Sequence, residues 1–205
     1  MSLLIKMGYP VLTVTESKAG IRVRQDRFLE SGPADPKENK TIWFKGISNK
    51  HIRIVLIDFH RTVPLSLLSV DGNGKASVDN SAVLDSREKT LAIDPGKLFK
   101  LNAGTSGVCQ YQLKNFEVCY AYSWALPLSS DRVLYTPDRL FSIATEAAKG
   151  DTIFSLKDRI GLVHDAFALS RATFAEVSSA LTLVDILKDE KECELCDRVS
   201  CSLAD

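Results

Sequence analysis

Two stretches near the middle of the chain, Phe99-Lys-Leu-Asn-Ala-Gly-Thr-Ser-Gly-Val108 and Arg132-Val-Leu-Tyr-Thr-Pro-Asp-Arg-Leu140, decide the fold. The first is typical of a strand that runs into a glycine-bearing turn, and the second of a short strand that ends at a helix start. Thr136 is a suitable N-cap, Pro137 suits the first helical position, and Asp138 favours the positive end of the helix dipole. The sequence before this point is typical of strands, and the sequence after it is typical of helices.

The N-terminal part of the chain predicts a series of short strands separated by turn residues. We expect these strands at Tyr9–Val14, Ile21–Leu29, Thr41–Phe44 continued at Val63–Val70, and a tight pair formed by Ala82–Ser86 and Lys89–Ile93. We expect turns at Ser17–Gly20, Asp71–Gly74 and Asp94–Gly96. Strands at this spacing, with no alternation of strand and helix, predict a β-sandwich domain over residues 1–136.

Two atypical segments interrupt this domain. Residues 45–62 divide the strand that Thr41–Phe44 begins, and they include the strongly β-prone run Ile52–Phe59. Residues 110–131 separate the two central stretches, and they hold a dense group of aromatic residues without the period of a strand or a helix. We interpret both segments as insertions.

The C-terminal part, residues 137–205, predicts antiparallel helices. The first runs from Pro137 to about Lys149 with Gly150 as its C′ residue, and the second begins at a capping box of Ser155 and Asp158. The third is expected to carry its main apolar face on Phe174, Val177, Leu181 and Val184, widened by Ala180, Leu183 and Leu187. The fold class is therefore α+β in two segments, an N-terminal β-sandwich followed by antiparallel α-helices. Helices with such broad apolar faces need another layer, so we expect the isolated chain to self-associate.

Composition narrows the class of protein. Lys plus Arg and Asp plus Glu both number 26, so no net field favours nucleic acid or an anionic membrane as a partner. The apolar run within Met1–Lys6 is too short for a signal peptide, and no run is long enough to span a bilayer. The odd count of five cysteines argues against a secreted disulfide framework and predicts a reducing, cytoplasmic setting.

Two sets of residues suggest metal binding, and neither is complete. Zinc hydrolases of the His-Glu-x-x-His type need two imidazoles one helical turn apart, whereas His51, His60 and His164 are widely separated. We therefore expect a structural or solvated role for His164. Cys193, Cys196 and Cys201 cluster near the end of the chain, but they supply three of the four ligands that a structural zinc site requires.

Other candidate sites have simpler structural interpretations. Gly104–Gly107 is followed by strand-like sequence and not by a helix, so it predicts a β-turn and not a phosphate loop. Cys109 has no identifiable base to activate it as a nucleophile. Arg22, Arg24 and Arg27 are spaced as the solvated outer face of a strand. We assign no catalytic, cofactor-binding or metal-binding residue.

Several stretches, taken in order, resemble the puromycin-sensitive type of zinc aminopeptidase. They are Met7–Val14, Ile21–Leu29, Val83–Lys89, Phe99–Val108, Arg132–Tyr135 and Asp158–Ser170. The resemblance implies that Met7 to about Tyr135 forms the small β-sandwich of that family, and that Pro137 begins its α-superhelical domain. The family's zinc-binding His-Glu-x-x-His with its distal Glu, its Gly-x-Met-Glu-Asn motif and its catalytic Tyr lie upstream of the matched part. No functional residue is therefore carried over to this chain.

The chain departs from the family pattern at three places. Family members would pass directly from Phe44 to Val63 and from Cys109 to Arg132, which suggests that both insertions come from a gene-model error. The family's helical turn usually carries glycine where this chain has Thr173, so we expect the turn between the second and third helices to be shifted. The tail beyond Glu192 matches poorly, and an expected tryptophan near Cys196 is missing.

The resemblance implies a non-catalytic fragment of a cytoplasmic zinc aminopeptidase that removes N-terminal residues from peptides. In the intact family enzyme zinc activates the attacking water and peptides are the substrates. The alternative is a stand-alone β-sandwich and helix binding module with no enzymatic role. A third interpretation, an independent Cys- or His-based enzyme, lacks a paired nucleophile and base.

The two insertions generate a stability prediction. An insertion within a strand breaks the hydrogen-bond ladder and disturbs its register, and Ile52–Phe59 adds an aggregation-prone run. Deleting Lys45–Thr62 and Gln110–Asp131 together should therefore raise the denaturation midpoint and reduce aggregation. Chemical denaturation and light scattering on the two chains measure this, and a lower midpoint for the double deletion would show that the segments are native structure.

Overall fold

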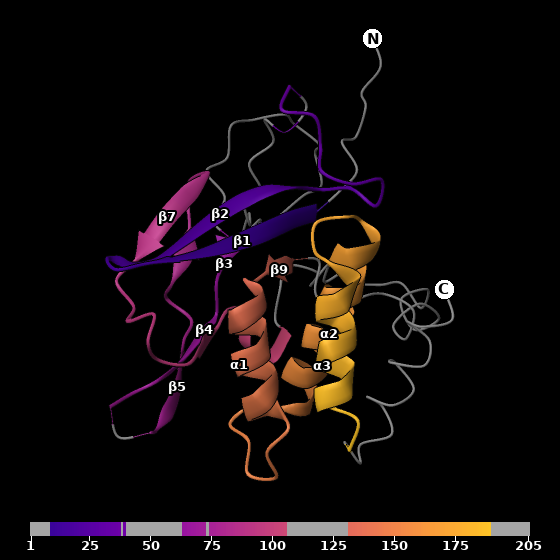
Figure 1. Cartoon of the computed structure of the whole chain (residues 1–205). Helices are drawn as coiled ribbons and strands as arrows, with labels where there is room; N and C mark the ends of the chain where they lie inside the picture. Colours follow the sequence, from indigo (N-terminus) through magenta and orange to yellow (C-terminus); the bar gives the residue numbers. More distant parts are fainter. Residues whose placement is uncertain (1–8, 38, 40–62, 73, 106–130, 190–205) are drawn as a thin grey trace, which may run out of the picture.

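The structure, a computed structural model, describes residues 9–37, 39, 63–72, 74–105 and 131–189. The largest sheet is built on a hairpin of β1 (Tyr9–Ser17) and β2 (Gly20–Phe28), in which Ser17 pairs with Gly20. Strand β7 (Glu88–Leu91) pairs antiparallel with β2, and β9 (Arg132–Leu134) pairs parallel with β1, so the strand order is β7-β2-β1-β9. This sheet lies across one end of the helices (Figure 1).

The remaining strands form two smaller antiparallel sheets. One pairs β3 (Val63–Pro64) with β6 (Val83–Leu84). The other has β4 (Leu67–Val70) between β5 (Ala76–Asp79) and β8 (Phe99–Lys100), and β8 leads into a short 3-10 turn, η1 (Ala103–Thr105).

Helices α1 (Pro137–Ala147), α2 (Leu156–Arg171) and α3 (Val177–Ile186) follow the strands in the described part of the chain. The predicted starts of α1 and α2 are confirmed. The Thr136 side chain caps α1, and Ser155 and Asp158 form the complete capping box of α2. The observed arrangement, mainly antiparallel sheets followed by helices, is the predicted α+β class.

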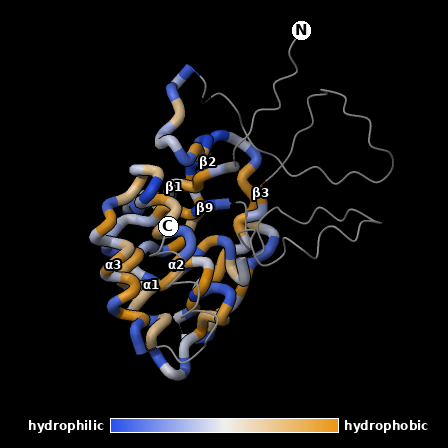
Figure 2. The backbone as a smooth tube through the Cα atoms, turned by 90° about the vertical axis from the view of Figure 1, so that its right-hand side faces the viewer, coloured by the Kyte–Doolittle hydropathy of each residue, from blue (hydrophilic) through white to orange (hydrophobic). Residues whose placement is uncertain are grey.

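One continuous hydrophobic core is shared by the strands and the helices. It includes buried side chains from the described strands and from all three described helices, among them Leu12, Ile21, Phe99, Ile143, Val163 and Leu183. Figure 2 shows hydrophobic and hydrophilic residues alternating along the helices and the strands. A smaller cluster of Val11, Phe28, Leu169 and Ala172 lies between the hairpin and the C-terminal end of α2.

The predicted continuous strand Val63–Val70 is wrong, because the chain breaks at Ser66, which has a φ of 37°. The carbonyl groups of Leu65 and Ser66 accept hydrogen bonds from the N–H groups of Asn102 and Ala103, at 2.7 and 2.9 Å. Within the stretch Phe99–Val108, the predicted strand is short and ends after Lys100, and the predicted glycine-bearing turn begins with η1. Two segments far apart in the sequence thus bend each other, which no local pattern reveals.

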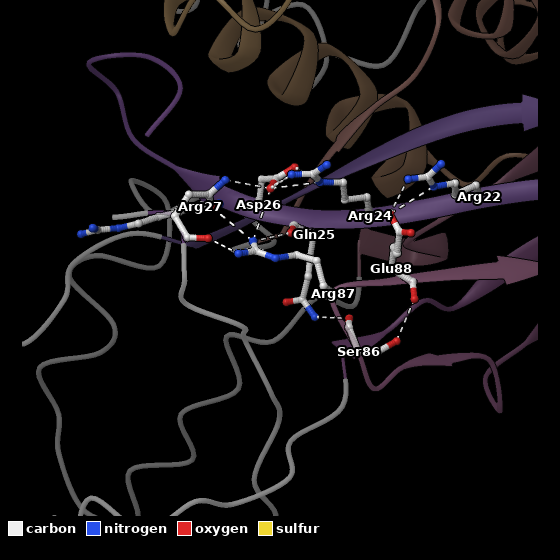
Figure 3. Close-up of polar contacts among 9 residues, drawn as sticks. Arg22, Arg24, Gln25, Asp26, Arg27, Ser86, Arg87 and Glu88 are labelled. Atoms are coloured by element: carbon white, nitrogen blue, oxygen red, sulfur yellow. Dashed lines mark hydrogen bonds and ion pairs between the residues drawn. The ribbon is translucent and has the colours of Figure 1, made fainter. Parts of the chain in front are cut away.

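The predicted tight pair of Ala82–Ser86 with Lys89–Ile93 is also wrong, because β6 pairs with β3 and β7 pairs with β2. Figure 3 shows the side chain that directs this pairing. Gln25, fully buried on β2, donates from its side chain to the Ser86 carbonyl at 2.7 Å and from its backbone to the Arg87 carbonyl at 2.9 Å. Strand β2 therefore forms hydrogen bonds with Ser86 and Arg87, the residues that would have formed the turn of the predicted tight pair.

Helix boundaries differ from the expectations at two places. Helix α1 ends at Ala147 with Ala148 as its C-cap, so Gly150 is not its C′ residue. Helix α3 begins at Val177, and Phe174 instead stacks on Phe28 with ring centroids 5.7 Å apart. Val177 and Leu181 of the predicted main face are turned outward, and Val184 is partly buried against the core. The residues expected only to widen this face, Ala180, Leu183 and Leu187, are buried. The expected strand Thr41–Phe44, both insertions except Asp131, and the tail from residue 190 lie outside the described residues.

The turn between α2 and α3 is not shifted, because Thr173 itself adopts the left-handed conformation that glycine favours, with a φ of 57°. Its N–H donates to the Ser170 carbonyl at 3.1 Å, and the Phe174 N–H donates to the Leu169 carbonyl at 2.9 Å. These two bonds are those of a Schellman motif with threonine at the C′ position.

We expect Thr173→Gly to stabilise the protein by about 0.5–1 kcal/mol, since relief of a left-handed β-branched residue outweighs the added entropy of the unfolded chain. Urea denaturation measures the change. Thr152→Gly is the matched control, because Thr152 is not among the residues with a positive φ, and this control should lower stability. Equal destabilisation by both substitutions would contradict the argument.

Candidate functional site

The carboxylate of Asp158 lies at the centre of a buried polar network where β8, η1 and α2 meet. One oxygen, Oδ1, accepts hydrogen bonds from the Lys100 ammonium and from the Gly104 N–H, both at 2.7 Å. The other oxygen, Oδ2, accepts from the Ser155 N–H at 3.1 Å and from the Ser155 hydroxyl at 2.6 Å. The Asp158 and Lys100 side chains are each only 4% exposed. One charged group therefore joins a strand, a turn and a helix N-terminus.

The surroundings of Asp158 favour its ionised form. Burial raises the pKa of this carboxyl, but the Lys100 charge and the hydrogen bonds from Lys100, Ser155 and Gly104 outweigh that effect and hold the pKa below its usual range. The Lys100 ammonium also donates to the carbonyl groups of Leu101 and Asn102, at 3.3 and 3.1 Å. The pair is thus a structural ion pair with its hydrogen-bonding capacity already used within the protein.

A second buried contact joins β9 to α2. The Arg132 Nη1 atom lies 2.6 Å from His164 Nδ1 and 3.0 Å from Asp165 Oδ1, and the Val133 N–H donates to Asp165 Oδ2 at 3.1 Å. Because a guanidinium only donates, His164 Nδ1 must accept, which leaves the ring proton on Nε2. Burial raises the pKa of Asp165, and the charge of Arg132 opposes that shift. His164 therefore has the structural role expected of it, but as the partner of an arginine that the sequence did not indicate.

A third contact joins α1 to the first hairpin. The guanidinium of Arg139, a buried residue, donates to both carboxylate oxygens of Glu16, at 2.7 and 3.0 Å. It also donates to the carbonyl groups of Lys97, at 3.0 Å, and Pro95. Its Cζ atom lies 4.4 Å from the centre of the Phe99 ring, a cation–π contact. This bidentate, stacked arrangement fixes the start of α1 on the first hairpin and on the segment before β8.

A cavity of about 370 Å³ lies between strands β1 and β9 and the three helices. Its lining is mainly apolar and includes Val14, Leu134, Leu140, Leu162, Phe174 and Ala180. Two carboxylates, Asp165 and Glu176, also reach it, but Asp165 accepts bonds from Arg132 and Val133, and Glu176 accepts one from Ser178. The cavity is large enough for a small ligand, yet its lining offers no nucleophile paired with a base.

The arginines of β2 behave largely as expected. Arg22 and Arg24 are exposed and form surface ion pairs with Glu88, at 2.5 Å, and Asp26, at 3.0 Å (Figure 3). Arg27 differs, because it is half-buried. The solvated outer face is therefore confirmed for Arg22 and Arg24, whereas Arg27 is only partly exposed.

Most of the other candidate residues lie outside the described part of the chain, namely His51, His60, Cys109, Cys193, Cys196 and Cys201. Of the predicted glycine turn, Gly104 is described, with a φ of 67° inside η1, and its N–H binds Asp158. Within the described ranges, no group of three or more His, Cys, Asp or Glu side chains is arranged to hold a metal ion. None of the helices in these ranges has the length and apolar content needed to span a bilayer.

Comparison with known proteins gives the clearest indication of relationship. Aminopeptidase 2, mitochondrial, from Saccharomyces cerevisiae is 28% identical over 200 residues, which cover 97% of this chain and 16% of that relative. The alanine/arginine aminopeptidase of the same organism is 25% identical over 199 residues, with 97% and 18% coverage. Glutamyl aminopeptidase from Bos taurus is 27% identical over 187 residues, with 91% and 15% coverage.

The chain is related in sequence to aminopeptidases. No protein-family model matches it. The chain spans less than a fifth of the length of the relatives it matches, so the similarity concerns one portion of those proteins. In this aminopeptidase-related chain, three ion pairs connect the strands to the helices, namely Lys100–Asp158, Arg132–Asp165 and Glu16–Arg139.

We expect the Asp158–Lys100 pair to show strong energetic coupling. Asp158→Asn should cost about 3–5 kcal/mol, because it leaves the Lys100 ammonium buried without its counter-charge. Lys100→Met should cost less in the Asp158→Asn background than in the parent chain, with a coupling energy of about 1–3 kcal/mol. The matched control is the exposed pair of Arg22 and Glu88, for which the same double-mutant cycle should give little coupling.

The pH dependence of this coupling follows from the lowered pKa of Asp158. A carboxyl with a lowered pKa in the folded state stabilises the protein above its unfolded pKa, about 3.9, and this stabilisation disappears as the pH falls through the folded pKa. The stabilities of the parent chain and Asp158→Asn should therefore converge in acid. A difference that stays constant from pH 7 to pH 2 would contradict the ionic assignment.

Proposed function

We propose that this chain is a non-catalytic portion of a zinc aminopeptidase of the puromycin-sensitive type. In this proposal it contributes the β-sandwich and the first helices of the α-superhelical domain to an enzyme that removes N-terminal residues from peptides. The observation that carries the proposal is the extent of the similarity, which covers 87–97% of this chain and only 14–18% of each relative. A chain matched over nearly its whole length to a small part of several aminopeptidases corresponds to one structural portion of them.

The geometry of the described residues supports a scaffolding role. The buried charged groups at the junction, Lys100, Asp158, Arg132, Asp165 and Arg139, each bind a partner within the protein. A catalytic acid or base needs a free position beside the substrate, whereas these groups are committed to holding helices on strands. The metal of the proposed enzyme has no matching ligand set among the described residues, so we assign no step of peptide hydrolysis to this chain.

The outward face of α3 supports continuation of the helical domain. Val177 and Leu181 are 57% and 50% exposed and lie one turn apart, where they form an apolar ridge on α3. A superhelical domain needs such a ridge, because each helix is covered by the next one. We further propose a cytoplasmic location, which the odd cysteine count supports; one relative is named as mitochondrial.

A segment exchange tests the proposal. We expect a chimera in which this chain replaces the matched 16% of Aminopeptidase 2, mitochondrial, from Saccharomyces cerevisiae to retain hydrolysis of aminoacyl reporter substrates. The same chimera lacking residues 45–62 and 110–130, a deletion that spares the buried Asp131, should be at least as active. Asp158→Asn is the matched variant, and it should lower the yield of folded enzyme with little effect on the KM of the folded fraction.

The isolated chain provides the complementary measurement. It should hold no stoichiometric zinc by elemental analysis and should not cleave the reporters, because the ligand set of the family lies outside the matched part. One tightly held zinc per chain together with EDTA-sensitive hydrolysis would overturn the proposal. So would folded chimeras that are inactive both with and without the two insertions, since that result favours a stand-alone binding module.

A further inference from the structure

Two side chains that can both carry positive charge meet at the junction of β9 and α2. The Arg132 Nη1 atom lies 2.6 Å from His164 Nδ1, and the same nitrogen donates to Asp165 Oδ1 at 3.0 Å. The Arg132 side chain is only 6% exposed, and its buried Nε atom has no acceptor among the described residues. Because a guanidinium keeps its charge and only donates, this contact exists only while His164 is neutral and accepts at Nδ1.

We propose that His164 is a pH-sensitive switch, whose protonation below neutral pH weakens the junction of β9 with α2. A proton on Nδ1 removes the acceptor and places an imidazolium directly against the Arg132 guanidinium. Like charges at this distance repel strongly when they are shielded from water. Histidine is the side chain that ordinarily changes its charge between pH 5 and 8, so the switch acts in that range.

Acidic groups near the pair moderate this repulsion. The buried Asp131 precedes Arg132 in the sequence, and Asp165 follows His164. Their negative charges lower the cost of protonating the imidazole, but neither restores the hydrogen bond that Arg132 loses. The charge of Lys100 reaches Asp165 as well and makes the surroundings more positive.

The other elements that pack on α2 contribute little charge to the contact. In the described part of the chain, their ionisable groups and the adjoining ones bind partners of their own, namely Lys100 with Asp158, Asp185 with Lys188, and Glu176 with Ser178. The turn η1 has no ionisable side chain, and burial raises the pKa of Tyr135, which therefore stays neutral. On α2 itself, positions more than one turn away from His164 hold Lys157, Arg159 and Arg171.

The direction of the pH effect follows from comparing folded and unfolded chains. A histidine in an unfolded chain takes up a proton with a pKa of about 6.5, whereas in the folded chain the proton displaces the Arg132 contact. The stability that this contact supplies is therefore present above about pH 6.5 and is lost as the pH falls. Burial raises the pKa of Asp165, and this acts in the opposite direction, because a raised carboxyl pKa favours proton uptake by the folded state. The pKa of Asp158 is lowered, so the Lys100–Asp158 pair stays charged in this range.

The test uses the full chain with His51→Gln and His60→Gln, which leaves His164 as its only histidine. The matched variant adds His164→Asn, whose side-chain oxygen can replace Nδ1 as an acceptor for Arg132 but does not titrate. Urea denaturation at pH 7.5 and pH 5.5 gives the folding equilibrium constant of each chain, at protein concentrations where the midpoint does not depend on concentration.

We expect the folding equilibrium constant to fall more steeply between these pH values when His164 is present. Carboxylates are common to both chains, so the loss with His164 should exceed the loss with His164→Asn by about fivefold to tenfold. Equal losses in the two chains would overturn the proposal.

Nuclear magnetic resonance of the chain that retains His164 gives a second measurement, which does not require the His164→Asn variant to fold. At pH 7.5 the nitrogen chemical shifts of the ring should be those of a neutral imidazole with its proton on Nε2. A proton on Nδ1 at this pH is incompatible with the Arg132 contact and would also overturn the proposal.

Discussion

The arrangement of strands and helices depends on the contacts of the Asp158 carboxylate. It neutralises the buried Lys100 ammonium, binds the Gly104 N–H and caps its own helix through Ser155. One turn further along α2, Gly161 faces η1 so closely that a Cβ atom there would lie 2.1 Å from Thr105 Cγ2. The N-terminal half of α2 is therefore held in one position on the strands, by charge at Asp158 and by close approach at Gly161.

The other buried ion pairs extend this constraint. Asp165 lies two turns beyond Asp158 on α2 and binds Arg132 of β9, while Arg139 of α1 binds Glu16 of β1. In each pair one residue precedes the helical segment and its partner lies within it. Removing either the strand segment or the helical segment of the chain would leave buried charges without partners, which costs several kcal/mol for each charge. The boundary at Thr136 separates two kinds of sequence, but the core and the ion pairs continue across it.

The features that were predictable from sequence are those set by neighbouring residues. The Ser17–Gly20 turn, the Thr136 cap and the Ser155–Asp158 capping box depend on a few adjacent positions, and all three are confirmed. The errors arise where distant segments compete for backbone hydrogen bonds. Asn102 and Ala103 break the strand at Ser66, and Gln25 on β2 takes the carbonyl groups of Ser86 and Arg87.

In the candidate site too, contacts between neighbouring residues are predictable from the sequence, whereas contacts between distant residues are not. Asp158 was predicted as a helix cap, but its partner Lys100 lies 58 positions earlier in the chain, and nothing near Lys100 marks it as buried. Arg132 and Arg139 lie within the stretch Arg132–Leu140. Arg132 is on a buried strand and Arg139 is on the buried face of a helix, and both positions would ordinarily be apolar. A charged residue in such a place is a usable signal of a buried ion pair, although it does not identify the partner.

The exposed apolar side chains of α3 are positioned by the same constraint. Val177 and Leu181 are 57% and 50% exposed, and in the proposed enzyme they would be covered by a following helix. Because the buried ion pairs hold α1 and α2 on the strands, and α3 packs against both helices, the position of this surface is set by the same charges that join the two halves of the chain.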